Sequence, residues 1–189
     1  MNEQKLVHSF ILYPFALLLC IRWAVFNRLL LAILYLLCTA SFAAANTFDD
    51  ALAVYERGDY VQAMKLFRQL AEKGNQWAQR RVGSMYAEGK GATQDYQEAV
   101  KWYRLAAAQG NELAQVNLGV MYSKGRGVGQ DFVRAHMWFD LAVAASTGHS
   151  RDTAIENRDR IASKMTAEQI TTAQEMARHC QESKLKNCD

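Results

Sequence analysis

The residues of this chain that could carry out acid–base or metal chemistry are few and scattered. The histidines beyond residue 45 are His136, His149 and His179, and they lack the spacing of metal ligands. We therefore expect surface or capping roles for them and predict no metal site. Glu88 and Glu98 could form a carboxylate pair, but both lie where helices normally carry solvated charge.

The sequence motifs of common hydrolases and nucleotide-binding proteins are absent. The chain contains no H-E-x-x-H, G-x-S-x-G or Walker A motif. The glycine-rich stretch 125–129 (GRGVG) is similar to a phosphate loop, but 89–93 (GKGAT) stands 36 positions earlier in the same surroundings. This recurrence indicates a repeated turn, so we predict no catalytic residue and no cofactor.

Cysteines are the remaining reactive side chains. Cys20 and Cys38 lie in an N-terminal segment that we expect to be removed, which leaves Cys180 and Cys188. An even number of cysteines in an exported chain indicates a disulfide, and the two can meet if the chain turns at 184–187. If the chain is not exported, two free thiols are the alternative.

The first 45 residues differ in kind from the rest of the chain. An uncharged apolar run at 29–38 follows Arg28, and small residues dominate 39–45. A positive flank, an apolar core and a small-residue site together predict a secretory signal that is cleaved after Ala45.

A second apolar stretch, at 6–21, precedes this signal and makes it unusually long. Translation beginning at Val25 would give an ordinary short signal, so we expect that the start is assigned too early. The alternative is a retained membrane anchor, although 16 residues that include Pro14 are short for a span of about 20.

Among the remaining residues, the segment 78–149 consists of two similar copies of one 36-residue unit. Shifting 78–113 by 36 positions places it on 114–149 with 14 identities. A fixed period of this length is typical of a solenoid of stacked supersecondary units. The identical pairs are Ala78/Ala114, Gln79/Gln115, Gly83/Gly119, Met85/Met121, Tyr86/Tyr122, Gly89/Gly125, Gly91/Gly127, Gln94/Gln130, Asp95/Asp131, Ala99/Ala135, Trp102/Trp138, Leu105/Leu141, Ala106/Ala142 and Ala108/Ala144.

Each copy predicts two helices joined by a glycine-rich turn. Apolar residues recur at helical spacing before the turn, and the second helix begins at Asp95 or Asp131, a residue type that favours the N-cap. Glu98 stands where a capping box requires it, and Gly110 is the expected C-cap of the second repeat.

Gly83 and Gly119 lie inside the first helix of their copies, where glycine costs about 1 kcal/mol relative to alanine. Because the glycine recurs in the same register, we expect a bulky neighbour to pack against the bare backbone. We predict that this neighbour is the tryptophan of the second helix, Trp102 or Trp138.

The shared pattern, A-x3-[VL]-G-x2-Y-x2-G-x-G-x3-D-x3-A-x2-W-[YF]-x2-A, resembles the Sel1-like repeat, a relative of the tetratricopeptide repeat. The resemblance implies an all-α fold, a right-handed α-solenoid of antiparallel helix pairs that acts as a protein-binding scaffold. It implies no shared chemistry. Some members of this family pair cysteines within each repeat, and this sequence lacks those cysteines.

The repeat pattern extends on both sides of the two full copies. Residues 46–77 read as an atypical first tetratricopeptide-like repeat with a shorter turn, and Trp77 reads as a staple between repeats. The two Sel1-like copies are 78–113 and 114–149. Beyond them the period is lost, and 150–189 reads as a capping helix pair with a tail.

The first helix of each pair lines the groove in tetratricopeptide-like stacks, and the resemblance carries this geometry to the present chain. Positions that differ between the copies are those open to specificity. The candidate groove residues are Arg80, Arg81, Ser84, Asn117 and Val120. Paired arginines suit carboxylate or carbonyl groups, so an extended peptide with an acidic group would fit. The alternative is an unconstrained solvated surface.

The balance of charged residues bears on the class of partner that the protein binds. The chain has 22 Lys+Arg against 19 Asp+Glu without clustering, which argues against nucleic acid. We therefore predict an exported protein, periplasmic or secreted, that binds a protein or peptide and leaves the membrane after signal cleavage. The alternative function is a cell-envelope enzyme, or an enzyme accessory, that acts on cell-wall material.

Overall fold

The computed structural model describes residues 47–186 and 188. The chain divides into two units, 1–45 and 46–189. The predicted signal segment, 1–45, lies outside the described residues. The described part is built from helices and contains no strand, which confirms the predicted all-α class. Its helices are α2 (Phe48–Glu56), α3 (Tyr60–Glu72), α4 (Gln76–Glu88), α5 (Tyr96–Ala107), α6 (Glu112–Lys124), α7 (Phe132–Ala145), α8 (Gly148–Ala162) and α9 (Ala167–Glu182).

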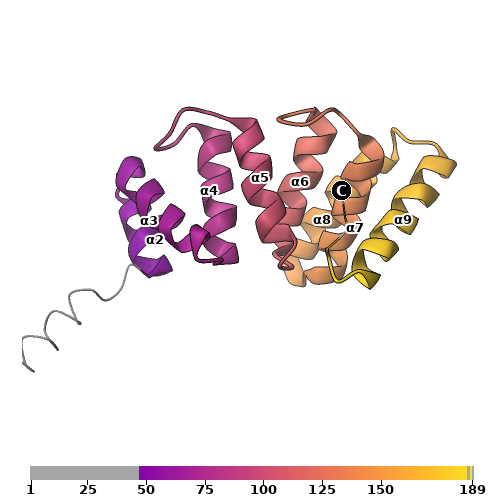
Figure 1. Cartoon of the computed structure of the whole chain (residues 1–189). Helices are drawn as coiled ribbons and strands as arrows, with labels where there is room; N and C mark the ends of the chain where they lie inside the picture. Colours follow the sequence, from indigo (N-terminus) through magenta and orange to yellow (C-terminus); the bar gives the residue numbers. More distant parts are fainter. Residues whose placement is uncertain (1–46, 187, 189) are drawn as a thin grey trace, which may run out of the picture. The chain divides into compact units, whose positions relative to one another are not determined.

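Successive helices form pairs that stand in a row (Figure 1). The pairs are α2 with α3, α4 with α5 and α6 with α7, and contacts of α3 with α4 and of α5 with α6 join each pair to the next. One pair is too small to bury its own apolar face, so the neighbouring pair covers the remainder. This arrangement is the predicted solenoid of stacked helix pairs. None of the described helices has the length and apolar content that crossing a membrane requires.

Side-chain caps fix where the helices begin. Asp95 and Asp131 are the N-caps of α5 and α7, as predicted, and each accepts a hydrogen bond from a first-turn amide. Thr166 and Gln169 form the predicted capping box of α9. Two details of the prediction are wrong: Glu98 turns away from Asp95 to pair with Lys101, and α5 ends before Gly110, with Ala108 as its C-cap.

The glycines inside α4 and α6 make room for an aromatic ring, but the ring is not the one we predicted. A Cβ at Gly83 would lie 2.7 Å from the Tyr103 ring, and a Cβ at Gly119 would lie 2.5 Å from the Phe139 ring. The tryptophans one residue earlier point elsewhere, because adjacent helix residues are about 100° apart and only one can face the glycine.

The two glycine-rich turns hold one repeat to the previous one. A Cβ at Gly91 would collide with the carbonyl oxygen of Tyr60, and a Cβ at Gly127 would collide with that of Tyr96. Tyr60 and Tyr96 are the first residues of α3 and α5. Each turn therefore rests on the start of the preceding second helix, and only glycine permits so close an approach.

Three cations reinforce these junctions from equivalent positions. The Nζ atom of Lys90 lies 5.4 Å from the centroid of the Tyr60 ring, and the guanidinium carbon of Arg126 lies 5.3 Å from that of Tyr96. At the end of the stack, Lys164 lies 5.8 Å from the ring centroid of Phe132, the first residue of α7. The α8–α9 turn therefore contacts the start of the preceding second helix, as the turns of the repeats do, although its sequence has lost the 36-residue period.

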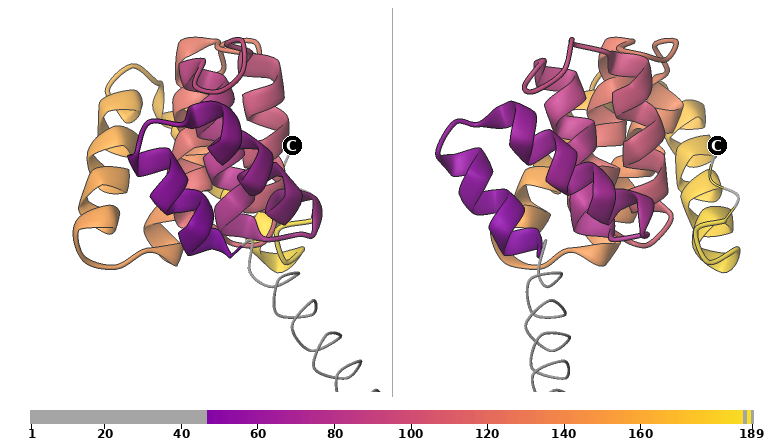
Figure 2. Two further views of the ribbon diagram at one scale, coloured as in Figure 1. Left: turned by 90° about the vertical axis from the view of Figure 1, so that its left-hand side faces the viewer. Right: turned by 60° about the vertical axis from the view of Figure 1, so that its left-hand side comes forward.

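The C-terminal helices do not form a helix pair like those of the repeats. Both α8 and α9 pack on α7, and they make far fewer contacts with each other. Both views of Figure 2 separate the two helices by other parts of the stack. The predicted capping function fits this position, but the predicted pairing of the two helices is wrong. The physical reason is that the apolar stripe of α9, which includes Ala173, Ala177 and Cys180, is buried against α7 and not against α8.

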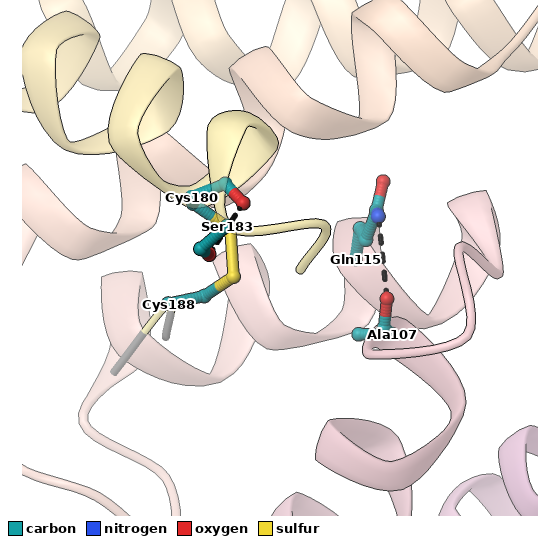
Figure 3. Close-up of a disulfide and its surroundings, with 5 residues drawn as sticks. All are labelled: Ala107, Gln115, Cys180, Ser183 and Cys188. Atoms are coloured by element: carbon teal, nitrogen blue, oxygen red, sulfur yellow. Dashed lines mark hydrogen bonds between the residues drawn. A yellow bond between two sulfur atoms is a disulfide. The ribbon is translucent and has the colours of Figure 1, made fainter. Parts of the chain in front are cut away.

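A disulfide joins Cys180, at the end of α9, to Cys188 (Figure 3). The two Cα atoms lie 4.8 Å apart, and the chain turns between them through Lys184 and Leu185, both with positive φ. Cys180 is fully buried, and Leu185 belongs to the apolar cluster of α5, α6 and α7. The disulfide therefore closes the tail back onto the repeats.

Candidate functional site

The five residues predicted to line the groove lie on α4 and α6, and all are half-buried. Arg80, Arg81 and Ser84 belong to α4, whereas Asn117 and Val120 belong to α6. Arg80 and Ser84 are one helical turn apart, so their side chains share one face of α4. The structure places these residues on two neighbouring first helices, and their surroundings divide them into different groups.

Arg81 packs against aromatic rings of the first repeat. Its guanidinium carbon lies 5.1 Å from the ring centroid of Tyr55 and 6.0 Å from that of Phe67. Its Nε atom is buried without a hydrogen-bond partner. Arg81 therefore ties α4 to the first repeat through aromatic rings, and its role as a groove residue stays a prediction.

Arg80 has a different environment. Burial lowers the pKa of its guanidinium, the adjacent charge of Arg81 lowers it further, and Tyr103 and Glu112 act in the opposite direction. Its Nε atom is also buried without a hydrogen-bond partner. Arginine stays protonated in proteins, so Arg80 is a partly desolvated cation that an anionic group would stabilise.

The influence of Glu112 on Arg80 also shows that the start of α6 lies near this face of α4. Ser84 contributes a hydroxyl that accepts a hydrogen bond of 3.2 Å from Tyr103. The ring of Tyr103 is buried, and burial raises its pKa to about 12. The Ser84–Tyr103 bond therefore anchors α4 to α5 next to Arg80.

Trp77 lies on the same side of α4 and was predicted to be a staple between repeats. The structure leaves 44% of it exposed, and Leu113, the equivalent residue of α6, is 37% exposed. A large part of the Trp77 side chain is therefore accessible to a partner. Trp77, Arg80 and Ser84 follow each other at helical spacing, and Leu113 and Val120 occupy the same register on α6.

A pocket that the sequence analysis missed opens between α5 and α7. It has a volume of about 400 Å³. Its lining residues come from α5, from the end of α6, from the glycine-rich turn and from the first turn of α7: Arg104, Tyr122, Val128, Gly129, Gln130, Asp131 and Arg134. The groove residues were predicted from the first helices of the two copies, whereas Arg134 differs from its counterpart Glu98 in the second helix.

His136 is buried, contrary to the surface or capping role predicted for it. Only 2% of it is exposed, and its Nδ1 atom lies 3.0 Å from a carboxylate oxygen of Asp140. Arg158 of α8 approaches the other oxygen of Asp140 at 3.6 Å. This group joins α7 to α8. Among the described residues, no cluster of three metal-ligating side chains occurs.

Stacked helix pairs, glycine-rich turns seated on the preceding repeat and an exposed first-helix face define this part of the chain as an α-solenoid of helix-pair repeats. The Sel1 repeat family matches it three times, at residues 51–75, 78–111 and 113–146. The chain therefore belongs to the Sel1-like repeat family. Proteins of this family are generally non-catalytic scaffolds that mediate protein binding.

Two solved structures are similar to this chain. One is a protective antigen of uropathogenic Escherichia coli strains that displays an SLR fold, with 36% identity and a TM-score of 0.64. The match covers 72% of this chain but 29% of the antigen, so this chain spans under a third of that protein. The other is a Sel1 repeat protein from Oxalobacter formigenes, with 38% identity, a TM-score of 0.45 and coverage of 46% of this chain and 66% of that chain. No curated protein matches the sequence.

Proposed function

We propose that this protein is an exported scaffold without catalytic activity that binds an extended acidic segment of a partner protein along α4 and α6. The observation that carries the proposal is Arg80, a half-buried guanidinium beside the positive charge of Arg81. A partner carboxylate would replace the lost hydration of Arg80 and form charge-assisted hydrogen bonds with it.

The residues around Arg80 support a peptide site. Trp77 offers an exposed aromatic surface one turn before Arg80, and tryptophan and arginine are the residue types most often found at binding hot spots. Across from them, Leu113 and Val120 of α6 offer an apolar floor, and Asn117 offers an amide. An acidic residue of the partner would contact Arg80 while a neighbouring apolar residue packs on α6.

Export is the other component of the proposal. The disulfide between Cys180 and Cys188 suits an oxidising compartment, periplasmic or extracellular. The sequence of 1–45 suits a cleaved signal, so the exported protein should begin at Asn46. The intact mass of protein recovered from the cell envelope or medium checks this start, and a mass that retains 29–45 would contradict it.

Peptide selection followed by affinity measurement tests the binding site. Peptides selected on the purified protein should be enriched in an acidic residue next to an apolar one. Arg80→Ala should weaken the best of them at least tenfold, whereas Arg178→Ala removes the same charge from an exposed site on α9 and should leave affinity unchanged. Equal affinity of both variants would contradict the proposal.

A further inference from the structure

A pocket of about 230 Å³ lies beside Gln115 of α6, where α5 and α7 end. We propose that this pocket, the Gln115 pocket, binds a neutral amide group that carries a small apolar group. Two residues along a helix correspond to a rotation of about 200°, so Gln115 faces the opposite side of α6 from Leu113 and Asn117. The Gln115 pocket is therefore separate from the α4–α6 peptide site, and the proposal does not depend on that site.

The side-chain amide of Gln115 is only half satisfied by the protein. Gln115 is 1% exposed, and its Nε2 atom donates to the carbonyl oxygen of Ala107 over 3.5 Å (Figure 3). Its Oε1 atom is buried and has no hydrogen-bond partner in the described part of the chain. Most buried acceptors in proteins have a donor, and leaving one without a partner is unfavourable. A ligand that donates to this oxygen would therefore be stabilised here.

The second repeat shows which group satisfies the equivalent oxygen. Its glutamine is Gln79, which donates to the carbonyl oxygen of Ala71 over 3.1 Å. The Oε1 atom of Gln79 accepts a hydrogen bond of 2.7 Å from the side-chain amide of Gln109. The residue 36 positions after Gln109 is Ala145, whose side chain has no donor. The third repeat has kept the glutamine but lost the amide that completes its bonding, so a ligand amide fits in the same place.

The C-terminal tail closes this place into a pocket in the third repeat only. Leu105 of the second repeat is 51% exposed, whereas its equivalent Leu141 is 2% exposed and lines the pocket. The helix α9 packs on α7, and its residue Gln181 and the tail residue Leu185 line the same pocket. Leu185 lies within the loop that the disulfide closes, so the disulfide holds this wall in position.

The chemistry of the lining favours a small, neutral ligand. None of the lining residues is charged, and Leu141, Ala144, Ala145 and Leu185 are apolar. An ion would lose its hydration there without gaining a counter-charge. The volume of about 230 Å³ is below the range of roughly 300–1,000 Å³ that drug-sized ligands occupy. The ligand class is therefore an amide N–H group next to an apolar group of about the size of a leucine side chain, from a peptide residue or a free small amide.

NMR titration of the purified, oxidised protein with uncharged probes tests the proposal. The probes are N-methyl-4-methylpentanamide, which has one N–H group, and methyl 4-methylpentanoate, an ester of the same shape without it. We expect the amide to bind about fivefold more tightly, which is the usual effect of one neutral hydrogen bond. It should shift the side-chain amide signals of Gln115 and the backbone signal of Leu185.

A third probe, acetyl-leucine N-methylamide, distinguishes the two sources of the amide. Tighter binding than that of the simple amide identifies a peptide residue, and weaker binding identifies a free small amide. All three probes lack a carboxylate, so Arg80→Ala should leave their affinities unchanged. The result is therefore independent of whether the α4–α6 site binds an acidic peptide.

The variant Ala145→Gln places in the third repeat the residue that the second repeat has. Its amide should donate to Gln115 and fill the pocket, so the amide probe should bind at least tenfold more weakly. Ala145 is exposed at the end of α7, and glutamine is a good helix former, so the variant should fold. The matched control is Gln109→Ala, which removes the donor to Gln79 and should leave the affinity of the amide probe unchanged.

The proposal is overturned if the ester binds as tightly as the amide, if neither probe binds, or if the shifted signals lie away from Gln115 and Leu185. Unchanged affinity in Ala145→Gln also overturns it, as does a loss in Gln109→Ala equal to that in Ala145→Gln.

Discussion

Arg80 and Arg81 are adjacent in sequence, but their neighbours give them different roles. Arg81 lies over the rings of Tyr55 and Phe67, whereas Arg80 lies near Tyr103 and Glu112. Replacing both arginines at once would mix a loss of stability with a loss of binding. The two side chains therefore have to be tested separately.

We predict that Arg81→Ala lowers the free energy of unfolding by about 1–2 kcal/mol, because it removes a partly desolvated cation–π contact and the packing of the arginine stem. Arg80→Ala should change stability by about 0.5 kcal/mol or less, because no comparable contact is lost. Thermal unfolding followed by circular dichroism measures both. An equal loss in the two variants would contradict the division of roles.

Gly119 gives a second test at the level of single residues. Gly119→Val should destabilise by about 1–3 kcal/mol, because its side chain would overlap the Phe139 ring. Ser123→Ala on the same helix should have little effect, because the Ser123 hydroxyl only donates to the nearby carbonyl of Val120. Equal melting temperatures of the two variants would show that the helix register is wrong.

Recurrence in the sequence identified residues that the repeat requires, but it did not identify the residues that they contact. The repeated Gly83 and Gly119 predicted a close aromatic neighbour, but periodicity could not separate Tyr103 and Phe139 from the tryptophans beside them. Likewise, the recurrence of Gln115 gave no hint that its side chain donates to the carbonyl of Ala107 (Figure 3). Such contacts depend on the relative rotation of two helices, which a single sequence does not encode locally.

At the level of helices, Asp131 caps α7 and pairs with Arg134. Its pKa is lowered in the folded protein, so its contribution to stability is present above the unfolded-state value of about 3.9 and is lost as pH falls below it. Asp131→Asn keeps an acceptor for the helix amide but removes the charge.

We therefore expect Asp131→Asn to be less stable than the natural protein at pH 7, and the difference to disappear near pH 2. Urea unfolding at a series of pH values measures this. A stability difference that stays constant with pH would contradict an ionised cap.

The disulfide provides a prediction for α9 and the tail. Protein from an oxidising compartment should show no reactive thiol at Cys180 or Cys188 until it is reduced, because both are bonded. On the chain-entropy view, closing so short a loop contributes about 2–3 kcal/mol at most. Thiol labelling before and after reduction checks the bond, and labelling of both cysteines without reductant would exclude it.

The helices and their caps were largely predictable from the sequence, because Asp95, Asp131 and the Thr166 capping box act within one turn of chain. The packing of α9 on α7 was not, because both sides of that contact lie outside the repeated pattern. The pocket between α5 and α7 was also missed. It draws Arg104, Tyr122 and Arg134 from three helices of two repeats, and no local motif joins them.

For the molecule as a whole, the α4–α6 face is where we propose that a partner binds. The α4–α6 face carries Trp77 and Arg80 on first helices, and the pocket lies between the second helices α5 and α7. The α8 and α9 helices close the stack on α7, and the disulfide fixes the tail against it (Figures 1 and 3). We propose that such a scaffold positions a partner without altering it chemically.

Site-directed photo-crosslinking in the native cell tests the scaffold function most directly. A photoreactive amino acid is introduced singly at Ser84 on α4, at Asn117 on α6 and at Thr172, an exposed control position on α9. We predict that Ser84 and Asn117 crosslink to the same partner protein and that Thr172 does not. Crosslinking from Thr172 alone, or different partners at Ser84 and Asn117, would contradict a shared binding face on α4 and α6.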